Sequence, residues 1–493
     1  MNAKSYPLPT SVVTSLLFIA SALLCWIFAD LSIVTRTPWQ EFFRMAAGVF
    51  SPQWLPWPEL LSALAKTLAF GLLAVALSAL VGFLLCLYFH KRGVKLFCAS
   101  IRAVHELFWG LLFIQLLGLH PAAGLLAIAI PYSGIFAKVF AEIIEESETE
   151  SASSLPPASD KVSQFFYEKW PRIKAHFASY TLYRLECGLR SSTVLGFIGL
   201  PTLGFHLESG FMQGNYGLVT AMLIMLYVLI ASIRVWARFR LMPLYAGVAA
   251  FYLWAPLNID STLVLSLVHD MSPLPLRNTQ TEWWPWFSNL SSTQIFPGAL
   301  NTLLITQIAL VLTGVFSLIS FPLLSKQFFP RPTRSLSHLL MVMLRSTPEI
   351  ILAFVFLLLW GPSMLPAVLA LAIHNGAITS HLLARHSNEL ELRLDASRGI
   401  NRYLYEVLPR IYGQFLAFLC YRWEVIMRET AIVGILGIHT LGFYIDSAFE
   451  SFRLDVAVLL IAVSALMNIC VDEVARRTRR RLHLVKQPLV RAC

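Results

Sequence analysis

Charged residues are scarce in this sequence, since Asp, Glu, Lys and Arg fill only 13% of its 493 positions. Soluble domains carry about 25%. Hydrophobic residues fill 57% of the chain, and the mean hydropathy is +0.66. Such a composition excludes an ordinary soluble enzyme and predicts that lipid surrounds most of the chain.

Paired cysteines and the common motifs of catalysis are also missing. The seven cysteines include no CxxC pair, so neither a zinc site nor a disulfide framework is indicated. No GxxxxGK followed by Ser or Thr occurs, and HExxH and GxSxG are absent as well. His374 and His439 stand singly near apolar runs. We therefore predict no catalytic site, no metal site and no cofactor bound by this chain.

Long apolar runs are present instead, and about 20 apolar residues suffice to cross a bilayer core of about 30 Å. The first run extends past the core of a signal peptide, so we interpret it as a retained span. The runs predict an all-α integral membrane protein with about twelve transmembrane helices. They lie at Val12–Val34, Thr67–Phe89, Glu106–Leu119, Ala122–Ile143, Ser179–Phe197, Gly217–Val235, Met242–Leu257, Pro297–Leu324, Leu339–Trp360, Leu365–Leu383, Tyr412–Ile438 and Leu454–Val471.

The net charge of +10 is distributed unevenly, because every second loop is basic. The positive-inside rule then predicts that both termini are cytoplasmic. The arginines of the tail follow a span, which favours a topology signal or a contact with anionic lipid over nucleic-acid binding. The basic clusters contain Lys91, Arg92 and Lys95; Arg234, Arg238 and Arg240; Lys326, Arg331 and Arg334; and Arg476, Arg477, Arg479, Arg480 and Arg481.

The chain contains an internal repeat. Ten of 23 positions are identical between YRLECGLRSSTVLGFIGLPTLGF, starting at Tyr183, and YRWEVIMRETAIVGILGIHTLGF, starting at Tyr421, at a separation of 421 − 183 = 238. Glu106 and Glu349 form a weaker echo at a separation of 243. We predict two repeats, 1–240 and 241–493, of about six spans each, which an even number of spans places in one orientation.

The repeated segment carries charges and small residues within an apolar run. Charges at membrane depth are costly and usually face the bundle interior, and glycine lets helices approach closely or unwind. A translocation pathway is one interpretation; buried ion pairs that only compensate each other, together with tight helix packing, are the other. The candidate pathway residues are Arg184, Glu186, Arg190, Gly196, Gly199 and Gly204, and Arg422, Glu424, Arg428, Gly434, Gly437 and Gly442.

A polar loop precedes this segment in both repeats, at residues 142–178 and 385–411. Each loop is too long for a simple turn and contains a helix-like stretch that ends at Pro171 or Pro409. Two such elements on the cytoplasmic side favour a partner that binds twice. A connector without a partner is the alternative.

The phrases FAKVFAEIIEE (Phe136–Glu146), FASYTLYRLE (Phe177–Glu186) and the two STVLGFIGL-like segments resemble the permease subunit of phosphonate-type ABC importers. The resemblance covers about two-thirds of each half and implies two permease domains fused in tandem. It also implies a cytoplasmic coupling helix that docks on ATPase subunits, ATP and magnesium bound there, and an extracytoplasmic binding protein. The implied coupling residues are Ala158, Ser159, Pro171, Arg172, Ala396, Ser397, Pro409 and Arg410.

The loops depart from the family pattern. Where Gly-Ala-Ser is usual, this chain has Pro157-Ala158-Ser159 and Asp395-Ala396-Ser397, so the two coupling sites are expected to be unequal. The implied substrate is phosphonate or a related phosphorus oxyanion, and the implied location is the bacterial inner membrane. A secondary active transporter of a small anion is the alternative, because such carriers can also be parallel repeats of six helices.

Overall fold

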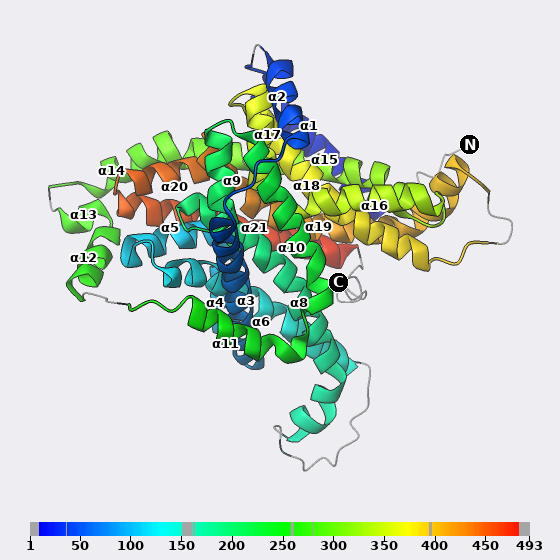
Figure 1. Cartoon of the computed structure of the whole chain (residues 1–493), viewed down its shortest axis with the longest axis horizontal. Helices are drawn as coiled ribbons and strands as arrows, with labels where there is room; N and C mark the ends of the chain where they lie inside the picture. The colour runs from blue at the N-terminus through cyan, green and yellow to red at the C-terminus, as the bar shows by residue number, and fades with distance from the viewer. Residues whose placement is uncertain are drawn as a thin grey trace, which may run out of the picture. The chain divides into compact units, whose positions relative to one another are not determined.

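The computed structural model describes residues 9–35, 37–149, 160, 163–257, 261–278, 280–393 and 397–482 (Figure 1). All regular secondary structure in these residues is helical. Side chains on the outer faces of the long helices are largely apolar, as Leu17, Ile27 and Leu80 illustrate. The predicted all-α membrane protein is therefore confirmed.

The described residues form two compact units. The N-unit comprises residues 42–272, and the C-unit comprises the residues up to 41 together with those from 273 on. The N-unit contains most of α2 (Pro38–Phe50), then α3 (Trp57–Leu87), α4 (Arg92–Ala103), α5 (Glu106–Leu117), α6 (Pro121–Thr149), η1 (Gln164–Lys169), α8 (Trp170–Val194), η2 (Leu195–Ile198), α9 (Leu203–Met212), α10 (Tyr216–Trp236), η3 (Phe239–Leu241), α11 (Met242–Tyr252) and α12 (Ser261–Met271).

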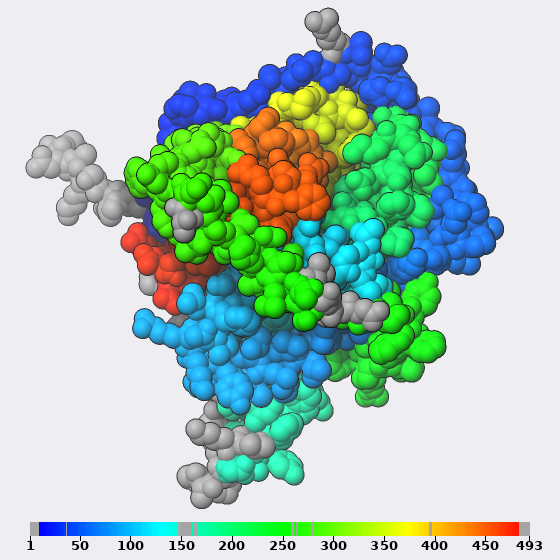
Figure 2. All heavy atoms as spheres, turned by 90° about the vertical axis from the view of Figure 1, so that its left-hand side faces the viewer, coloured from blue at the N-terminus to red at the C-terminus, as the bar shows by residue number. Residues whose placement is uncertain are grey.

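The C-unit begins with the first helix of the chain and continues with the helices of the second half. Its element α20 lies at the surface, where it is drawn in orange in Figure 2. The elements are α1 (Thr10–Phe28), α13 (Leu274–Arg277), α14 (Trp283–Leu290), η4 (Ser291–Ile295), α15 (Phe296–Leu324), α16 (Arg331–Ser346), α17 (Glu349–Trp360), α18 (Met364–Glu389), η5 (Arg402–Val407), α19 (Leu408–Ile432), η6 (Val433–Leu436), α20 (Leu441–Glu450) and α21 (Leu454–Arg481).

The first helix of each half packs in the unit of the other half. In the C-unit, α1 packs on α15, where the Gln307 amide donates to the Ser21 hydroxyl at 2.7 Å. In the N-unit, α11 packs on α3. The compact units therefore do not coincide with the halves 1–240 and 241–493, whose role as the duplicated domains stays a prediction.

The elements from α3 to α10 recur in the same order from α15 to α21. Their first residues are separated by 239 for α3 and α15 (296 − 57) and by 243 for α5 and α17 (349 − 106). The separation becomes 238 from η1 and η5 onward (402 − 164). Because α16 has 16 residues and α4 has 12, the four extra residues account for the change from 239 to 243.

Within the residues that the structure describes, seven helices are long and apolar enough to cross a membrane, and up to ten spans result if each of three bent helix pairs counts as one. The bends are 87° between α4 and α5, 94° between α16 and α17, and 48° before α20. Two of the twelve predicted runs fall short of this count. The run at 179–197 lies in α8, which carries several charges, and α11 has only 11 residues, or about 16 Å.

Candidate functional site

Each repeat contains a helix that breaks between two segments. The helix α8 ends in the 3-10 turn η2, and α9 starts after the extended residue Thr202; α19, η6 and α20 repeat this with Thr440. Gly199 and Gly437 lie in the left-handed region, with φ of +88° and +85°, which glycine adopts without steric cost. The helix therefore unwinds at these glycines in both repeats, which is one of the two interpretations that the sequence leaves open.

Close approach of the two segments requires a second pair of glycines. A Cβ atom on Gly196 would lie 2.0 Å from the Phe205 nitrogen, and one on Gly434 would lie 2.2 Å from the Phe443 nitrogen. No side chain fits at such distances from backbone. Gly204 and Gly442 lie in the first turns of α9 and α20, directly opposite this contact. These glycines thus fix the geometry of the break.

The first backbone amide after each break is already hydrogen-bonded. The Leu203 N–H donates to the Thr67 hydroxyl of α3 at 2.9 Å, and the Leu441 N–H donates to the Thr302 hydroxyl of α15 at 3.1 Å. Irregular backbone at membrane depth must find such partners within the protein. These two amides are therefore occupied and are not available to a ligand.

A chain of polar side chains runs through the interior of the N-unit. The guanidinium of Arg184 lies over the Tyr132 ring, 4.3 Å from its centroid. The Tyr132 and Ser191 hydroxyls are 2.9 Å apart, and Ser191 donates to a Glu106 oxygen at 2.7 Å. The Ser191 hydroxyl has one proton and donates it to Glu106, so the Tyr132 hydroxyl is the donor to Ser191. We call Arg184, Tyr132, Ser191 and Glu106 the first polar chain.

The C-unit contains a chain at the equivalent positions. Arg422 donates to the Asn375 amide oxygen at 3.4 Å, and the Asn375 amide nitrogen donates to a Glu429 oxygen at 2.8 Å. Glu349 completes what we call the second polar chain, Arg422, Asn375, Glu429 and Glu349. The residue separations are 238 for Arg184 and Arg422 and for Ser191 and Glu429, and 243 for Tyr132 and Asn375 and for Glu106 and Glu349.

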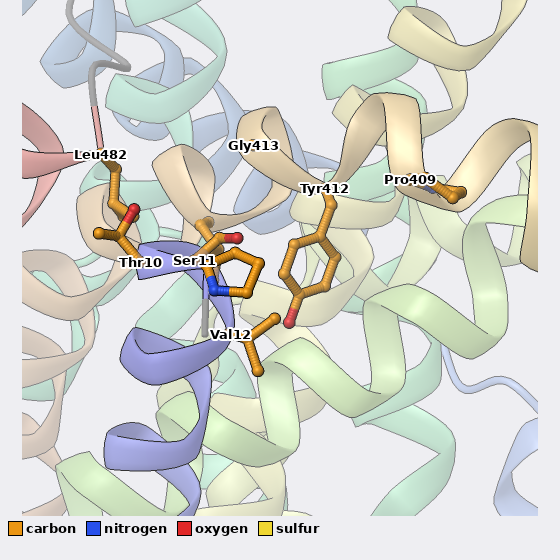
Figure 3. A pocket seen from close by; sticks show the side chains of 9 residues that line it. Thr10, Ser11, Val12, Pro409, Tyr412, Gly413 and Leu482 are labelled. Carbon is orange, nitrogen blue, oxygen red and sulfur yellow. The ribbon is translucent and has the colours of Figure 1, made fainter. Parts of the chain in front are cut away.

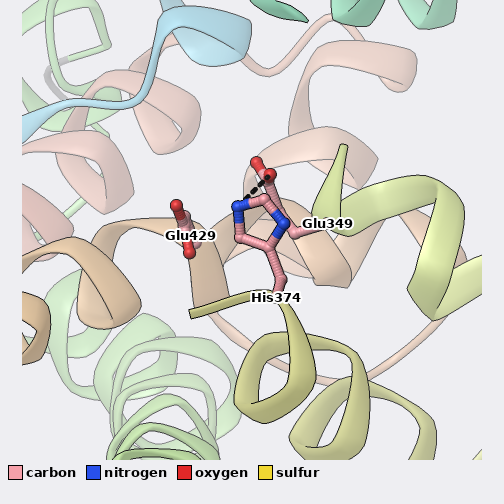
Figure 4. Close-up of side chains that lie close together, drawn as sticks. All are labelled: Glu349, His374 and Glu429. Atoms are coloured by element: carbon pink, nitrogen blue, oxygen red, sulfur yellow. Dashed lines mark ion pairs between the residues drawn. The ribbon is translucent and has the colours of Figure 1, made fainter. Parts of the chain in front are cut away.

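Beside the second polar chain lies His374, which is fully buried on α18. Its Nε2 atom is 4.0 Å from a Glu349 oxygen, and its Nδ1 atom is 3.3 Å from the Leu344 carbonyl. One ligand atom each from Glu349, His374 and Glu429 lie within 4.8 Å of one another (Figure 4). The three residues come from α17, α18 and α19, so a search for closely spaced ligands in the sequence does not find them.

The sequence pointed to the arginine at the start of each polar chain and recorded Glu106 with Glu349 only as an echo of the repeat. Tyr132, Ser191, Asn375 and Glu429 were missed. The repeat could have revealed them. When the two halves are aligned with separations of 243 and 238 residues, these four polar residues occupy matching positions within apolar spans. Glu186, Arg190, Glu424 and Arg428 lie partly buried on α8 and α19, and their role in a pathway stays a prediction.

Hydrogen bonds hold the second coupling segment, η5, in place. Arg402 donates to the Ser397 and Gln327 carbonyls, both at 2.8 Å. Arg410 donates to a Glu406 oxygen at 2.7 Å and to the Glu391 carbonyl at 3.0 Å. Both η1 and η5 are short π-helical turns directly before a helix whose second residue is proline, and π-helical turns are frequent at functional sites.

The first coupling segment, η1, is held by aromatic side chains instead. The Phe83 ring lies 6.1 Å from the centroids of both Phe165 and Trp170, and Phe140 stacks on Phe177 at 4.0 Å. Pro171 and Arg172 are exposed at the start of α8, as Pro409 and Arg410 are at the start of α19. Ala158, Ser159 and Ala396, which the resemblance names, lie outside the described residues.

A shallow cavity of about 400 Å³ opens beside the second coupling segment. In Figure 3, Thr10, Ser11 and Val12 of α1 lie across from Pro409 and Tyr412 of α19. The Tyr412 hydroxyl is 2.7 Å from that of Ser15. The start of α1 is thereby attached to the start of α19.

Long apolar helices, broken spans and a repeated element order define a polytopic membrane protein of the transporter class. The profile of the family described as binding-protein-dependent transport system inner membrane component matches residues 318–484. This part of the chain is thus similar to the membrane-embedded permeases of ABC transporters, and the apolar helices are those of a multi-pass protein of the inner membrane. In such systems ATP hydrolysis belongs to a separate subunit.

Individual relatives agree with this assignment. The phosphate-import permease protein PhnE of Mycolicibacterium smegmatis is 24% identical over 417 residues, covering 79% of this chain and 77% of the relative. The phosphite transport system permease protein PtxC of Stutzerimonas stutzeri is 27% identical over 242 residues, covering 48% and 86%. The phosphite transport permease HtxE of the same organism is 30% identical over 131 residues, covering 26% and 50%. No solved structure matches the chain.

Proposed function

We propose that this chain is a tandem fusion of two permease domains and forms the membrane channel of an ATP-driven importer of a phosphorus oxyanion. Phosphate, phosphite and phosphonate stand in the names of its relatives. The length of the chain and the recurring order of its helices support the fusion. The basic residues in every second loop, all on one side of the membrane, support cytoplasmic termini.

One observation carries the coupling part of the proposal. Two adjacent large side chains are exposed at the same place in both coupling segments, Phe166 with Tyr167 and Leu404 with Tyr405. Their exposed fractions are 53%, 79%, 44% and 76%. Aromatic side chains of this kind are typical centres of a protein interface. We propose that each pair docks on one ATPase subunit on the cytoplasmic side.

The broken helices suggest how docking could move the channel. Each coupling segment continues without interruption into α8 or α19, and each of these helices ends at the glycine break. A displacement of the coupling segment is therefore transmitted along one rigid helix to the break. A binding protein on the outer side would deliver the substrate.

The direct test is reconstitution of the chain with its ATPase and binding protein in proteoliposomes. We expect ATP-dependent uptake of at least one of radiolabelled phosphate, phosphite and methylphosphonate. Uptake that proceeds without ATP, driven by an ion gradient, would contradict the importer and favour a secondary transporter.

Docking is tested by co-purification with the ATPase. We expect Tyr405→Ala and Tyr167→Ala each to lower the amount of bound ATPase, with membrane insertion unchanged. Replacing Pro409 together with Arg410 should have the same effect, because Arg410 holds η5 through Glu406. Tyr252→Ala on α11 is the matched control, since Tyr252 is also exposed but lies outside the coupling segments. Undiminished ATPase binding in the coupling variants would refute the docking surface.

A further inference from the structure

The arginine of the first polar chain has no acidic partner in the part of the protein that the structure describes. Among the described residues, Nε and Nη2 of Arg184 are buried and have no hydrogen-bond partner. A cation at membrane depth is normally paired with a carboxylate or with backbone carbonyls. Arg184 therefore has donors available for a ligand.

The surroundings of Arg184 hold its positive charge without neutralising it. The face of the Tyr132 ring attracts the guanidinium, and the ring is fixed by its hydroxyl bond to Ser191. Glu106, the carboxylate of this chain, accepts from Ser191 and lies 3.3 Å from the His105 ring nitrogen. The Glu106 carboxylate is thus bonded at the opposite end of the first polar chain, where Tyr132 and Ser191 separate it from Arg184.

The equivalent place in the C-unit is less suitable for an anion. Arg422 donates to the Asn375 oxygen, so one of its donors is already used. Glu429 replaces Ser191, which brings a second buried carboxylate next to Asn375. The carboxylates of Glu349 and Glu429 lie within 4.8 Å of each other, and such a pair repels a further negative charge.

We propose that Arg184 is the side chain that contacts the translocated oxyanion, and that its repeat equivalent Arg422 has no such role. This inference rests on the proposed function for the identity of the anion as a phosphorus oxyanion. The planar guanidinium offers two parallel N–H donors, which match two oxygens of a tetrahedral oxyanion. Arg184 as a whole is partly exposed, but its two unpaired donors are buried, so an anion binds them only when the channel opens around this side chain. Only one half of the duplicated channel then binds substrate directly.

The test is anion binding by the purified full-length chain, measured as a shift in its melting temperature. Phosphate, phosphite, methylphosphonate and sulfate are each compared with sodium chloride at equal ionic strength. We expect at least one oxyanion to stabilise the wild type, and Arg184→Gln to weaken its apparent affinity about tenfold or more. Arg184→Lys keeps the positive charge but loses the two parallel N–H donors of the guanidinium, so we expect an intermediate affinity.

Two control variants separate a binding role from a structural one. Arg44→Gln removes another arginine that lies over a tyrosine, 5.8 Å from the Tyr216 ring centroid in the same unit, and should keep the stabilisation. Arg422→Gln should keep it too. Stabilisation by sulfate alone, lost only in the Arg184 variants, would support the anion contact and contradict the phosphorus substrate. Absence of stabilisation by any oxyanion, or equal loss in Arg184→Gln and Arg422→Gln, would overturn the inference.

Discussion

The first polar chain ends in one carboxylate and the second in two, although both begin with an arginine at the same place in the repeat. The intermediate positions differ as well, because Tyr132 and Ser191 correspond to Asn375 and Glu429. In contrast, the residues that shape the helix breaks are the same: Thr67 corresponds to Thr302, and the glycines coincide. The two repeats thus share the residues that shape the helix breaks and differ in the side chains of the buried polar chains.

The coupling segments show the same division. Their π-helical turn, the following proline and the exposed pair of large side chains occur in both. Their attachment differs, since aromatic rings hold η1 whereas Arg402 and Arg410 hold η5 through hydrogen bonds. If both segments dock, the common features are those that the ATPase contacts, and the attachment can vary without loss of function.

The largest effect, on folded yield, is expected at the break glycines, which are identical in the two repeats. Gly196→Ala and Gly434→Ala each place a methyl group about 2 Å from backbone nitrogen, which neither neighbour can avoid without moving a helix. Such overpacking costs about 3 kcal/mol or more. We expect both variants to lose most of their folded yield, measured by size-exclusion chromatography after detergent extraction.

A matched control for these variants is Gly247→Ala on α11, where an added Cβ meets nothing within 4 Å. It should leave the yield unchanged or slightly higher, because alanine favours a helix. Tolerance of alanine at one of the two break glycines would mean that the two breaks are not structurally equivalent.

A smaller effect, on the melting temperature, is expected in the polar chains, where the two repeats differ. Asn375→Leu removes the donor to the buried Glu429 carboxylate and the acceptor for Arg422. Hydrogen bonds to charged groups contribute about 2 kcal/mol, so the melting temperature should fall clearly. The double variant Asn375→Leu with Glu429→Met removes both partners and should recover part of the loss. A double variant that is as unstable as the sum of its single changes would show that Asn375 and Glu429 act independently.

The sequence predicted the fold class and the repeat, and offered unwinding at the glycines as one of two interpretations, because these features depend on local pattern. Apolar runs, the constant separation of 238 and the Gly-rich segments are all visible along the chain. The polar chains depend on which residues of three different helices meet, as Glu349, Asn375 and Glu429 do, and periodicity does not reveal this. The placement of α1 in the C-unit and α11 in the N-unit could not be predicted either, because apolar periodicity does not specify which helix an apolar face contacts.

The smallest effect is expected at Tyr132, the counterpart of Asn375. Tyr132→Phe removes the hydroxyl that donates to Ser191 but keeps the ring under Arg184. Neutral hydrogen bonds within membrane proteins contribute on average about 0.6 kcal/mol, so the melting temperature in the absence of oxyanions should fall much less than in Asn375→Leu. Tyr132→Leu also removes the ring and leaves the Arg184 cation without support, a contact worth about 2 kcal/mol where water is excluded. If Tyr132→Phe is as damaging as Asn375→Leu, the hydroxyl carries the stability of the first polar chain. The two chains would then be alike in energy despite their different charges, and the availability of Arg184 for an anion would lose its physical basis.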